Sequence, residues 1–240
     1  YLTFGDTVAN KTTYAVHMQG MCYNIEINAC NIYTDITATG SNYIPIRCYN
    51  RNQSKYLRDI RILNNNIRGG YYNMYMYYIS GNSSSNMPFT SVTIDGNALS
   101  DAYYSGIYTY YYGRYPSISN NIIKSRVNTP TTYYAIYSYY YTVVDSMQNN
   151  KIYIVSNSGG YGIRLYAYQN YTSSYGAKGP MYVANNEIIM SCKSTAYGMY
   201  LYSSSSPSHI SALHNSIYIN NTTTTYGIYK HINVYHIHLN

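Results

Sequence analysis

Charge is scarce in this sequence. Only 10% of its 240 residues are Asp, Glu, Lys or Arg, against about 25% in an ordinary soluble domain. So few charges argue against a long exposed helix, a coiled coil or a charge-rich disordered segment. No apolar run approaches the ~18–20 residues that a membrane-spanning helix needs. We therefore expect neither a helical bundle nor membrane insertion.

Cysteine is also scarce, and its spacing is not that of a metal or redox motif. Cys22, Cys30, Cys48 and Cys192 include no C-x-x-C pair, which excludes a zinc ribbon or a thioredoxin-type site. Buried free thiols are the favoured interpretation. A Cys22–Cys48 or Cys30–Cys48 bridge between neighbouring turns is the alternative, and it would fit an oxidising compartment.

Tyrosine and asparagine, in contrast, are abundant, with 39 and 28 residues. The asparagines mark a repeat whose anchor is followed two residues later by Ile or Leu. The seven anchors, spaced by about 31 residues on average, are Cys30 (in place of Asn), Asn65, Asn97, Asn121, Asn150, Asn186 and Asn215.

Two apolar columns accompany the anchors without exception. Two residues after the anchors are Ile32, Ile67, Leu99, Ile123, Ile152, Ile188 and Ile217. Three residues before the anchors are Ile27, Ile62, Ile94, Ile118, Met147, Val183 and Ala212. A second signature with period 2 begins at Tyr161 (Tyr-Gly-Ile-Arg-Leu-Tyr), with counterparts beginning at Tyr14, Tyr72, Ser105, Tyr134, Tyr197 and Tyr226. Each repeat thus contains three short strands.

A unit of this size cannot close a core alone, but stacked units bury a continuous interior. We therefore predict an all-β fold, a single-stranded parallel β-helix (solenoid) of about seven or eight coils, as one domain over residues 1–240. Asparagine suits its corners because it tolerates the left-handed backbone conformation and because stacked amides hydrogen-bond along the axis.

These Tyr-Gly-Ile-Tyr-Leu and Asn-Asn-x-Ile coils resemble the secreted right-handed parallel β-helix repeat proteins, including those of Bacteroidetes-like bacteria. The resemblance covers nearly the whole chain. It implies a right-handed coil and an extracellular or cell-surface location. It does not select a function, since this architecture carries lyases, hydrolases, adhesins and passive stalks alike.

Outward positions of the Tyr-Gly-Ile strands are mostly tyrosine. Two columns are predicted, comprising Tyr75, Tyr77, Tyr108, Tyr110, Tyr137, Tyr139, Tyr166, Tyr200, Tyr202 and Tyr229, with His17 and Arg164 as exceptions. Three interpretations stay open: cross-strand stabilisation, a protein–protein or filament interface, and stacking against sugar rings.

A basic segment is the second candidate binding site. Six of the 15 cations are Arg47, Arg51, Lys55, Arg58, Arg61 and Arg68. They form either a solvated loop and strand face or a site for an acidic polysaccharide or other polyanion. Specific nucleic acid is not expected, because the tyrosines do not alternate with these cations in a known reading motif.

Catalytic chemistry is not expected. Only eight acids are present and they do not recur at one repeat position, whereas a glycosidase needs two carboxylates about 5–10 Å apart. Asp95 and Asp101 come nearest, with Asp145 more distant. The pectinase-like signatures are absent. His231, His236 and His238 cluster without an evident third ligand, so no metal or cofactor is predicted.

The ends of the sequence bear on assembly. Tyr235–Asn240 repeats the pre-anchor pattern and stops within a coil, and no polar cap precedes the first coil. We expect a part of a longer chain or a unit that stacks through open ends. The sequence therefore indicates a secreted structural or adhesive solenoid whose partner is another copy of itself, with a polysaccharide-binding or polysaccharide-degrading module as the alternative.

Overall fold

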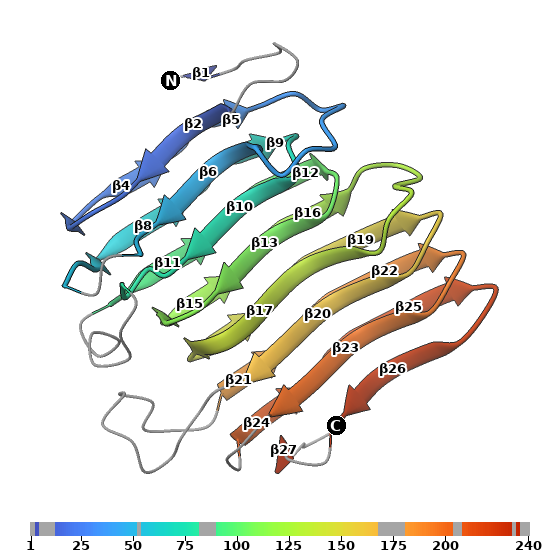
Figure 1. Ribbon diagram of the computed structural model, residues 1–240. Helices are drawn as coiled ribbons and strands as arrows, with labels where there is room; N and C mark the ends of the chain where they lie inside the picture. Colours follow the sequence, from blue (N-terminus) through green and yellow to red (C-terminus); the bar gives the residue numbers. More distant parts are fainter. Residues whose placement is uncertain are drawn as a thin grey trace.

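The computed structural model describes residues 3–4, 13–51, 54–81, 90–167, 181–203, 208–231 and 234–235. All regular structure in these segments is β-strand, and none of them contains a helix suited to crossing a membrane. The strands form three long sheets that extend along one stack of coils (Figure 1).

The sheets are numbered in the order in which each coil visits them. Sheet 1 contains β2 (Thr13–Met18), β6 (Tyr43–Tyr49), β10 (Tyr72–Tyr77), β13 (Ser105–Tyr110), β17 (Tyr133–Val144), β20 (Gly160–Ala167), β23 (Ala196–Ser203) and β26 (Thr225–Lys230), with β14 (Gly113–Tyr115) beside β17. Sheet 2 contains β4 (Glu26–Asn28), β8 (Ile60–Leu63), β11 (Val92–Asp95), β15 (Ser117–Ser119), β18 (Ser146–Gln148), β21 (Met181–Ala184), β24 (Ser208–Leu213) and β27 (Val234–Tyr235). Sheet 3 contains β1 (Thr3–Phe4), β5 (Asn31–Tyr33), β9 (Asn66–Arg68), β12 (Ala98–Ala102), β16 (Ile122–Ser125), β19 (Lys151–Ser156), β22 (Glu187–Cys192) and β25 (Ser216–Asn221). A short pair joins β3 (Cys22–Tyr23) to β7 (Leu57–Arg58).

Every strand pairs in parallel with the equivalent strand of the next coil. For example, β10 pairs with β6 on one side and β13 on the other, while β12 pairs with β9 and β16. A chain that returns to the same sheet one rung further along at each turn is a solenoid. The predicted all-β parallel solenoid is confirmed.

The apolar columns predicted from the repeat fill the interior. Ile62 pairs with Ile94 in sheet 2, and Ile67 pairs with Leu99 in sheet 3. All four side chains are buried. The matching column of sheet 1 is buried as well and consists of Ile46, Met74, Ile107, Ile136, Ile163 and Met199. Three inward columns therefore meet in one continuous core.

An asparagine ladder joins the coils at the corner between sheets 2 and 3. Its members are Asn65, Asn97, Asn121, Asn150, Asn186 and Asn215. From Asn65 to Asn186, each Nδ2 donates to the Oδ1 of the next member at 2.9–3.1 Å. A carbonyl of the preceding coil accepts from the same Nδ2, and from that of Asn215. Cys30 joins the ladder through its backbone N–H, which donates to Asn65 Oδ1 at 2.9 Å. The predicted amide stacking is therefore present.

The turn itself is made by the residue before the anchor. The sequence predicted asparagine at the corner for both the left-handed conformation and the stacking, without dividing the two roles between positions. The residue before each anchor has the positive φ, and these residues are Ala29, Asn64, Gly96, Asn120, Asn149, Asn185 and His214. Two successive positions therefore make the corner: the residue before the anchor turns the chain, and the anchor supplies the amide of the ladder.

One coil of sheet 1 lacks the signature that revealed the others. In β6, Ile44 stands opposite Tyr14 and Ile46 opposite Val16. Pro45 lies between them at the usual Gly or Ala position. Since neither Tyr nor Gly marks this strand, only the pairing identifies it.

All four cysteines are free thiols, so neither suggested bridge forms. Cys48 and Cys192 are buried, as the favoured interpretation predicts, whereas Cys22 and Cys30 are half-buried. Burial raises the pKa of Cys192 to about 11, which keeps this thiol protonated and unreactive at neutral pH.

Glycines of the Tyr-Gly-Ile signature allow sheets 1 and 3 to approach closely. A Cβ on Gly162 would lie 2.5 Å from the carbonyl oxygen of Gly198 and 2.7 Å from Ile188 Cγ2. We expect Gly162→Ala to destabilise the fold by about 1–3 kcal/mol, because backbone must shift to admit the methyl group. Urea unfolding followed by circular dichroism measures this change.

Gly227 provides a matched control at the same position of the repeat. No described atom lies within 4 Å of a Cβ built there. Gly227→Ala should therefore change the unfolding free energy by less than about 0.5 kcal/mol. Equal effects of the two substitutions would contradict the close-approach argument.

Candidate binding face

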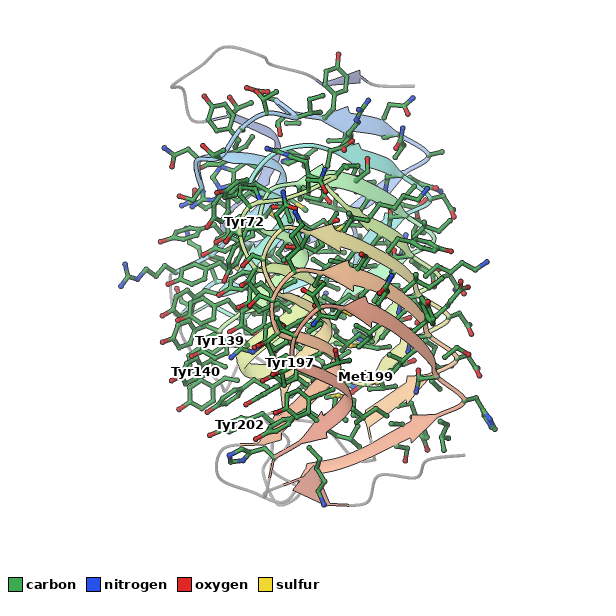
Figure 2. The ribbon with its side chains drawn as sticks, turned by 90° about the vertical axis from the view of Figure 1, so that its right-hand side faces the viewer. Tyr72, Tyr139, Tyr140, Tyr197, Met199 and Tyr202 are labelled. Atoms are coloured by element: carbon green, nitrogen blue, oxygen red, sulfur yellow. The ribbon has the colours of Figure 1, made fainter. Side chains whose placement is uncertain are left out.

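The ten tyrosines predicted to form two columns are all on strands of sheet 1. In the first column, Tyr75 pairs with Tyr108, which pairs with Tyr137. In the second, Tyr77 pairs with Tyr110, which pairs with Tyr139. The first column continues in register through β20, β23 and β26. In the second column the register between β17 and β20 shifts after Ser138, and Tyr166 pairs with Tyr202 beyond this shift. Figure 2 shows Tyr139, Tyr140 and Tyr202 along one side of the stack, with Met199 away from that side.

Neighbouring rings of these columns are in contact, several of them stacked and others edge-to-face, as Tyr108 and Tyr137 are at 76°. In the second column, Tyr77 lies 5.3 Å from Tyr110 between ring centroids, and Tyr110 lies 5.2 Å from Tyr139, with an interplanar angle of 9°. In the first column, Tyr75 and Tyr108 are 5.5 Å apart and 3° from parallel. Parallel strands repeat identical side chains at about 4.8 Å, so offset ring stacking follows directly from the pairing.

A third column, which the sequence analysis missed, lies beside the first. Tyr134, Tyr161, Tyr197 and Tyr226 stack at 4.7–4.8 Å and within 10° of parallel. These tyrosines are the first residues of the Tyr-Gly-Ile and Tyr-Ala-Ile signatures. The tyrosine that opens each signature was therefore the signal for this column. The outward positions predicted above came only from the residues that follow the Gly or Ala, so this tyrosine was left out.

Further tyrosines continue the surface around the end of the strands. Tyr78, Tyr111 and Tyr140 have positive φ and stack at 4.9 and 5.5 Å. The runs Tyr110–Tyr112 and Tyr139–Tyr141 were their signal in the sequence. Below, the tyrosine face means the outward residues of sheet 1 in the three columns together with Tyr78, Tyr111 and Tyr140.

Stacking leaves the rings of this face half-buried. Tyr137 is only 6% exposed, in the middle of the first column, and Tyr226 is 38% exposed. Burial is the main cause that raises the pKa of Tyr77, Tyr139 and Tyr161 to about 12. The phenols therefore stay neutral at physiological pH, and the face presents hydroxyls and ring edges.

Two arginines interrupt the first column. Arg47 pairs with Tyr75, and Arg164 stands between Tyr137 and Tyr200. The Arg164 guanidinium lies 4.8 Å from the Tyr137 ring centroid and 5.3 Å from that of Tyr200, which is cation–π geometry. The column thus places positive charge within an aromatic surface.

Arg47 is also the partner of His17. Its Nη1 donates to His17 Nε2 at 3.0 Å, and its guanidinium lies over the rings of Tyr14 and Tyr49, at 4.6 and 4.2 Å. Burial, followed by the charge of Arg47, lowers the pKa of His17. The imidazole is therefore neutral at pH 7 and can accept this hydrogen bond.

The six cations of the predicted basic patch are not brought together on one surface. They are Arg47 on β6, Arg51 and Lys55 in the connection after it, Arg58 on β7, Arg61 on β8 and Arg68 on β9. The last three pair with Asp59, Glu26 and Asp101, at 3.4, 2.9 and 2.6 Å respectively. Of the six, Arg47 lies in the first tyrosine column, next to Tyr75.

The acids noted in the sequence each have a neighbouring partner. Asp95 ends β11 in sheet 2 and accepts a hydrogen bond from Asn120 Nδ2 at 3.0 Å. Asp101 is on β12 in sheet 3 and pairs with an arginine of the preceding coil. Asp145 pairs with Arg114 Nη2 at 2.9 Å. Asp95 and Asp101 therefore project from different sheets.

Neither carboxylates nor metal ligands gather near the tyrosine face. The nine strands of sheet 1, β14 included, contain no Asp or Glu. In the described segments no group of three His, Cys, Asp or Glu side chains could hold a metal ion. Of the predicted histidine cluster, His231 contacts the Tyr202 ring at 4.2 Å, while His236 and His238 lie outside the described residues.

Two hollows in the described part of the surface lie at sheet 3. One, of about 510 Å³, is lined by residues 185–189, 214 and 216–218, and another, of about 440 Å³, lies between β5 and β9. Neither touches a tyrosine column.

The fold, the ladder and the stacked columns define this molecule as a parallel β-helix. Comparisons with protein-family models, curated proteins and solved structures found no match to the chain.

Proposed function

We propose that this protein is an adhesive, non-enzymatic β-solenoid that acts outside the cell or at its surface, with the tyrosine face as its contact surface. One observation carries the proposal: tyrosines from successive coils form a continuous aromatic surface on the outer side of one sheet. Contiguous aromatic surface of this extent is unusual for a monomer without a partner. Tyrosine also combines contact area with a hydroxyl, which suits recognition.

The charge of the face favours an external partner over a second copy of the same face. Arg47 and Arg164 both lie within it, and sheet 1 supplies no carboxylate. Two copies packed through this face would confine four guanidinium groups without neutralising them, which opposes association.

We expect the double variant Tyr110→Ser/Tyr139→Ser to bind immobilised polysaccharide at least tenfold more weakly than the native chain. The two rings are a stacked pair near the middle of the face, where aromatic side chains contribute most to recognition. Surface plasmon resonance on dextran and dextran sulfate measures the loss, with circular dichroism to check the fold.

Tyr218→Ser is the matched control, because Tyr218 is 65% exposed but lies on β25 of sheet 3. It should bind like the native chain. Unchanged binding by the double variant would instead give the tyrosines a purely stabilising role.

A filament is the second candidate function, and a separate surface favours it. The outer side of sheet 3 exposes Ile122, Val155, Ile189 and Tyr218, each by 38–65%. Sedimentation and negative-stain microscopy of the same variants separate the two functions. Fibres that form in the native chain and are lost in Tyr218→Ser would assign lateral self-assembly to sheet 3.

A further inference from the structure

We propose that Arg164 is an anion-binding site within the tyrosine face and that the ligand is an anionic polysaccharide. This inference rests on the proposed adhesive function and specifies its partner. Arg164 occupies a position of the first column where both neighbouring coils have tyrosine. Its guanidinium carbon lies 4.8–5.5 Å from the ring centroids of Tyr134, Tyr137, Tyr161 and Tyr200.

The charge of Arg164 has no carboxylate partner in the described part of the chain. Arg58, Arg61, Arg68 and Arg114 all form ion pairs with carboxylates there. Arg164, in contrast, donates one hydrogen bond, from Nη1 to the Tyr134 hydroxyl at 3.3 Å. A guanidinium has five N–H donors in a planar fork that matches carboxylate and sulfate oxygens. A half-buried guanidinium with spare donors is therefore prepared for an anion from outside.

The Arg164 nitrogens that have no hydrogen-bond partner are not fully buried. No Arg164 nitrogen is among the buried, unpartnered polar atoms of the described residues. The surrounding rings exclude part of the water, so a charge-assisted hydrogen bond here is stronger than one on an open surface. Aromatic rings beside the cation offer faces and hydroxyls to an attached sugar ring.

Arg47 extends the site along the axis. It lies four rungs from Arg164 in the same column, about 19 Å away at the spacing of parallel strands, with Tyr75, Tyr108 and Tyr137 between them. A polymer with anionic groups at intervals can reach both arginines while its uncharged rings cross the three tyrosines. A small anion cannot bridge them.

The same spacing disfavours nucleic acid. Single-stranded nucleic acid carries a phosphate on every nucleotide and is bound by grooves lined with many cations. Two arginines separated by three tyrosines match a polymer whose anionic groups lie farther apart. The test therefore includes an oligonucleotide as a comparison ligand.

The test measures binding of the full chain to dextran, carboxymethyl dextran and dextran sulfate of equal length at several salt concentrations. The key variant is Arg164→Tyr, which removes the charge and makes the column continuous in tyrosine from Tyr75 to Tyr229. Arg164→Gln is a second variant in case the larger ring alters the sheet. Lys151→Gln, on the outer side of sheet 3, is the control with the same change in net charge.

We expect the native chain to prefer the two charged dextrans, with an affinity that falls as salt rises. Both Arg164 variants should weaken this binding about tenfold, the effect of losing one charge-assisted contact. Binding to neutral dextran should be unchanged, and Lys151→Gln should lose less than about twofold. Unfolding midpoints identify any variant that fails to fold.

Three results would overturn the inference. In the first, the Arg164 variants bind the charged dextrans as tightly as the native chain does. In the second, Lys151→Gln loses as much affinity as the Arg164 variants, which would mean that the preference for charged dextrans depends only on net charge. In the third, the chain binds a 20-nucleotide oligothymidylate more tightly than the charged dextrans and this binding also depends on Arg164, which would make nucleic acid the ligand.

The double variant Tyr110→Ser/Tyr139→Ser separates this inference from the adhesive function. If this variant alone loses binding, the adhesive function stands without the anion site. If it keeps all binding, the adhesive function fails as well.

Discussion

Asn121→Ala is expected to lower the free energy of unfolding by about 3–5 kcal/mol. The Asn121 side chain is fully buried in the middle of the ladder. Its Nδ2 donates to Ile94 O and Asn150 Oδ1, and its Oδ1 accepts from the backbone N–H and Nδ2 of Asn97, all at 3.0–3.1 Å. Alanine leaves these partners buried without water or a replacement, and each unsatisfied group costs about 1 kcal/mol or more.

Asn66→Ala is the matched control for this prediction. Asn66 is exposed, and its Nδ2 donates to Asn31 Oδ1 at 3.2 Å on the outer surface of sheet 3. Water can replace that bond, so the expected loss is below about 0.5 kcal/mol. Urea unfolding of both variants gives the comparison. A similar small loss for both would mean that the ladder only accompanies the fold and does not stabilise it.

Alkaline pH is expected to unfold the protein cooperatively as its tyrosines ionise. Burial raises the pKa of Tyr77, Tyr139 and Tyr161 from 10.0 to about 12, and it raises the pKa of Tyr75 and Tyr108 further. The unfolded chain loses these protons near pH 10, whereas the folded chain keeps them. Between pH 10 and 12 the unfolded state binds fewer protons, so stability is complete below pH 10 and falls as pH rises through this window.

Absorbance at 295 nm follows tyrosinate formation while circular dichroism follows the sheet. In the native chain both signals should change together above pH 11, whereas in guanidinium the tyrosines should titrate near pH 10. Ionisation of most tyrosines near pH 10 with the sheet intact would show that the columns are open to water.

The sequence alone determined the repeat and which residues of each coil point inward or outward. Asparagine recurs at every anchor except Cys30, and apolar residues alternate with outward residues on each side of it. This local pattern was sufficient to predict the parallel solenoid, the amide ladder and ten tyrosines on one face. A period of 2 leaves little freedom about which side chains point inward when one side of every strand must be buried.

Tertiary structure decided which coils become neighbours and in what register. The spacing between anchors varies from 24 to 36 residues, so sequence separation does not tell which loops bulge and which strands align. Pairing placed Ile44 opposite Tyr14, which revealed the coil without the signature, and put Arg47 in the tyrosine column while directing Arg61 and Arg68 to other sheets.

The composition of the tyrosine face depends on the same pairing. The ring stacking of the third column and the isolation of Arg164 from every described carboxylate arise only when β17, β20 and β23 are stacked in register. Local pattern fixes which side of a strand a residue occupies, but the neighbours across a parallel sheet come from coils about 30 residues away. Those contacts are set by the lengths and conformations of the intervening loops, which carry no periodic signal.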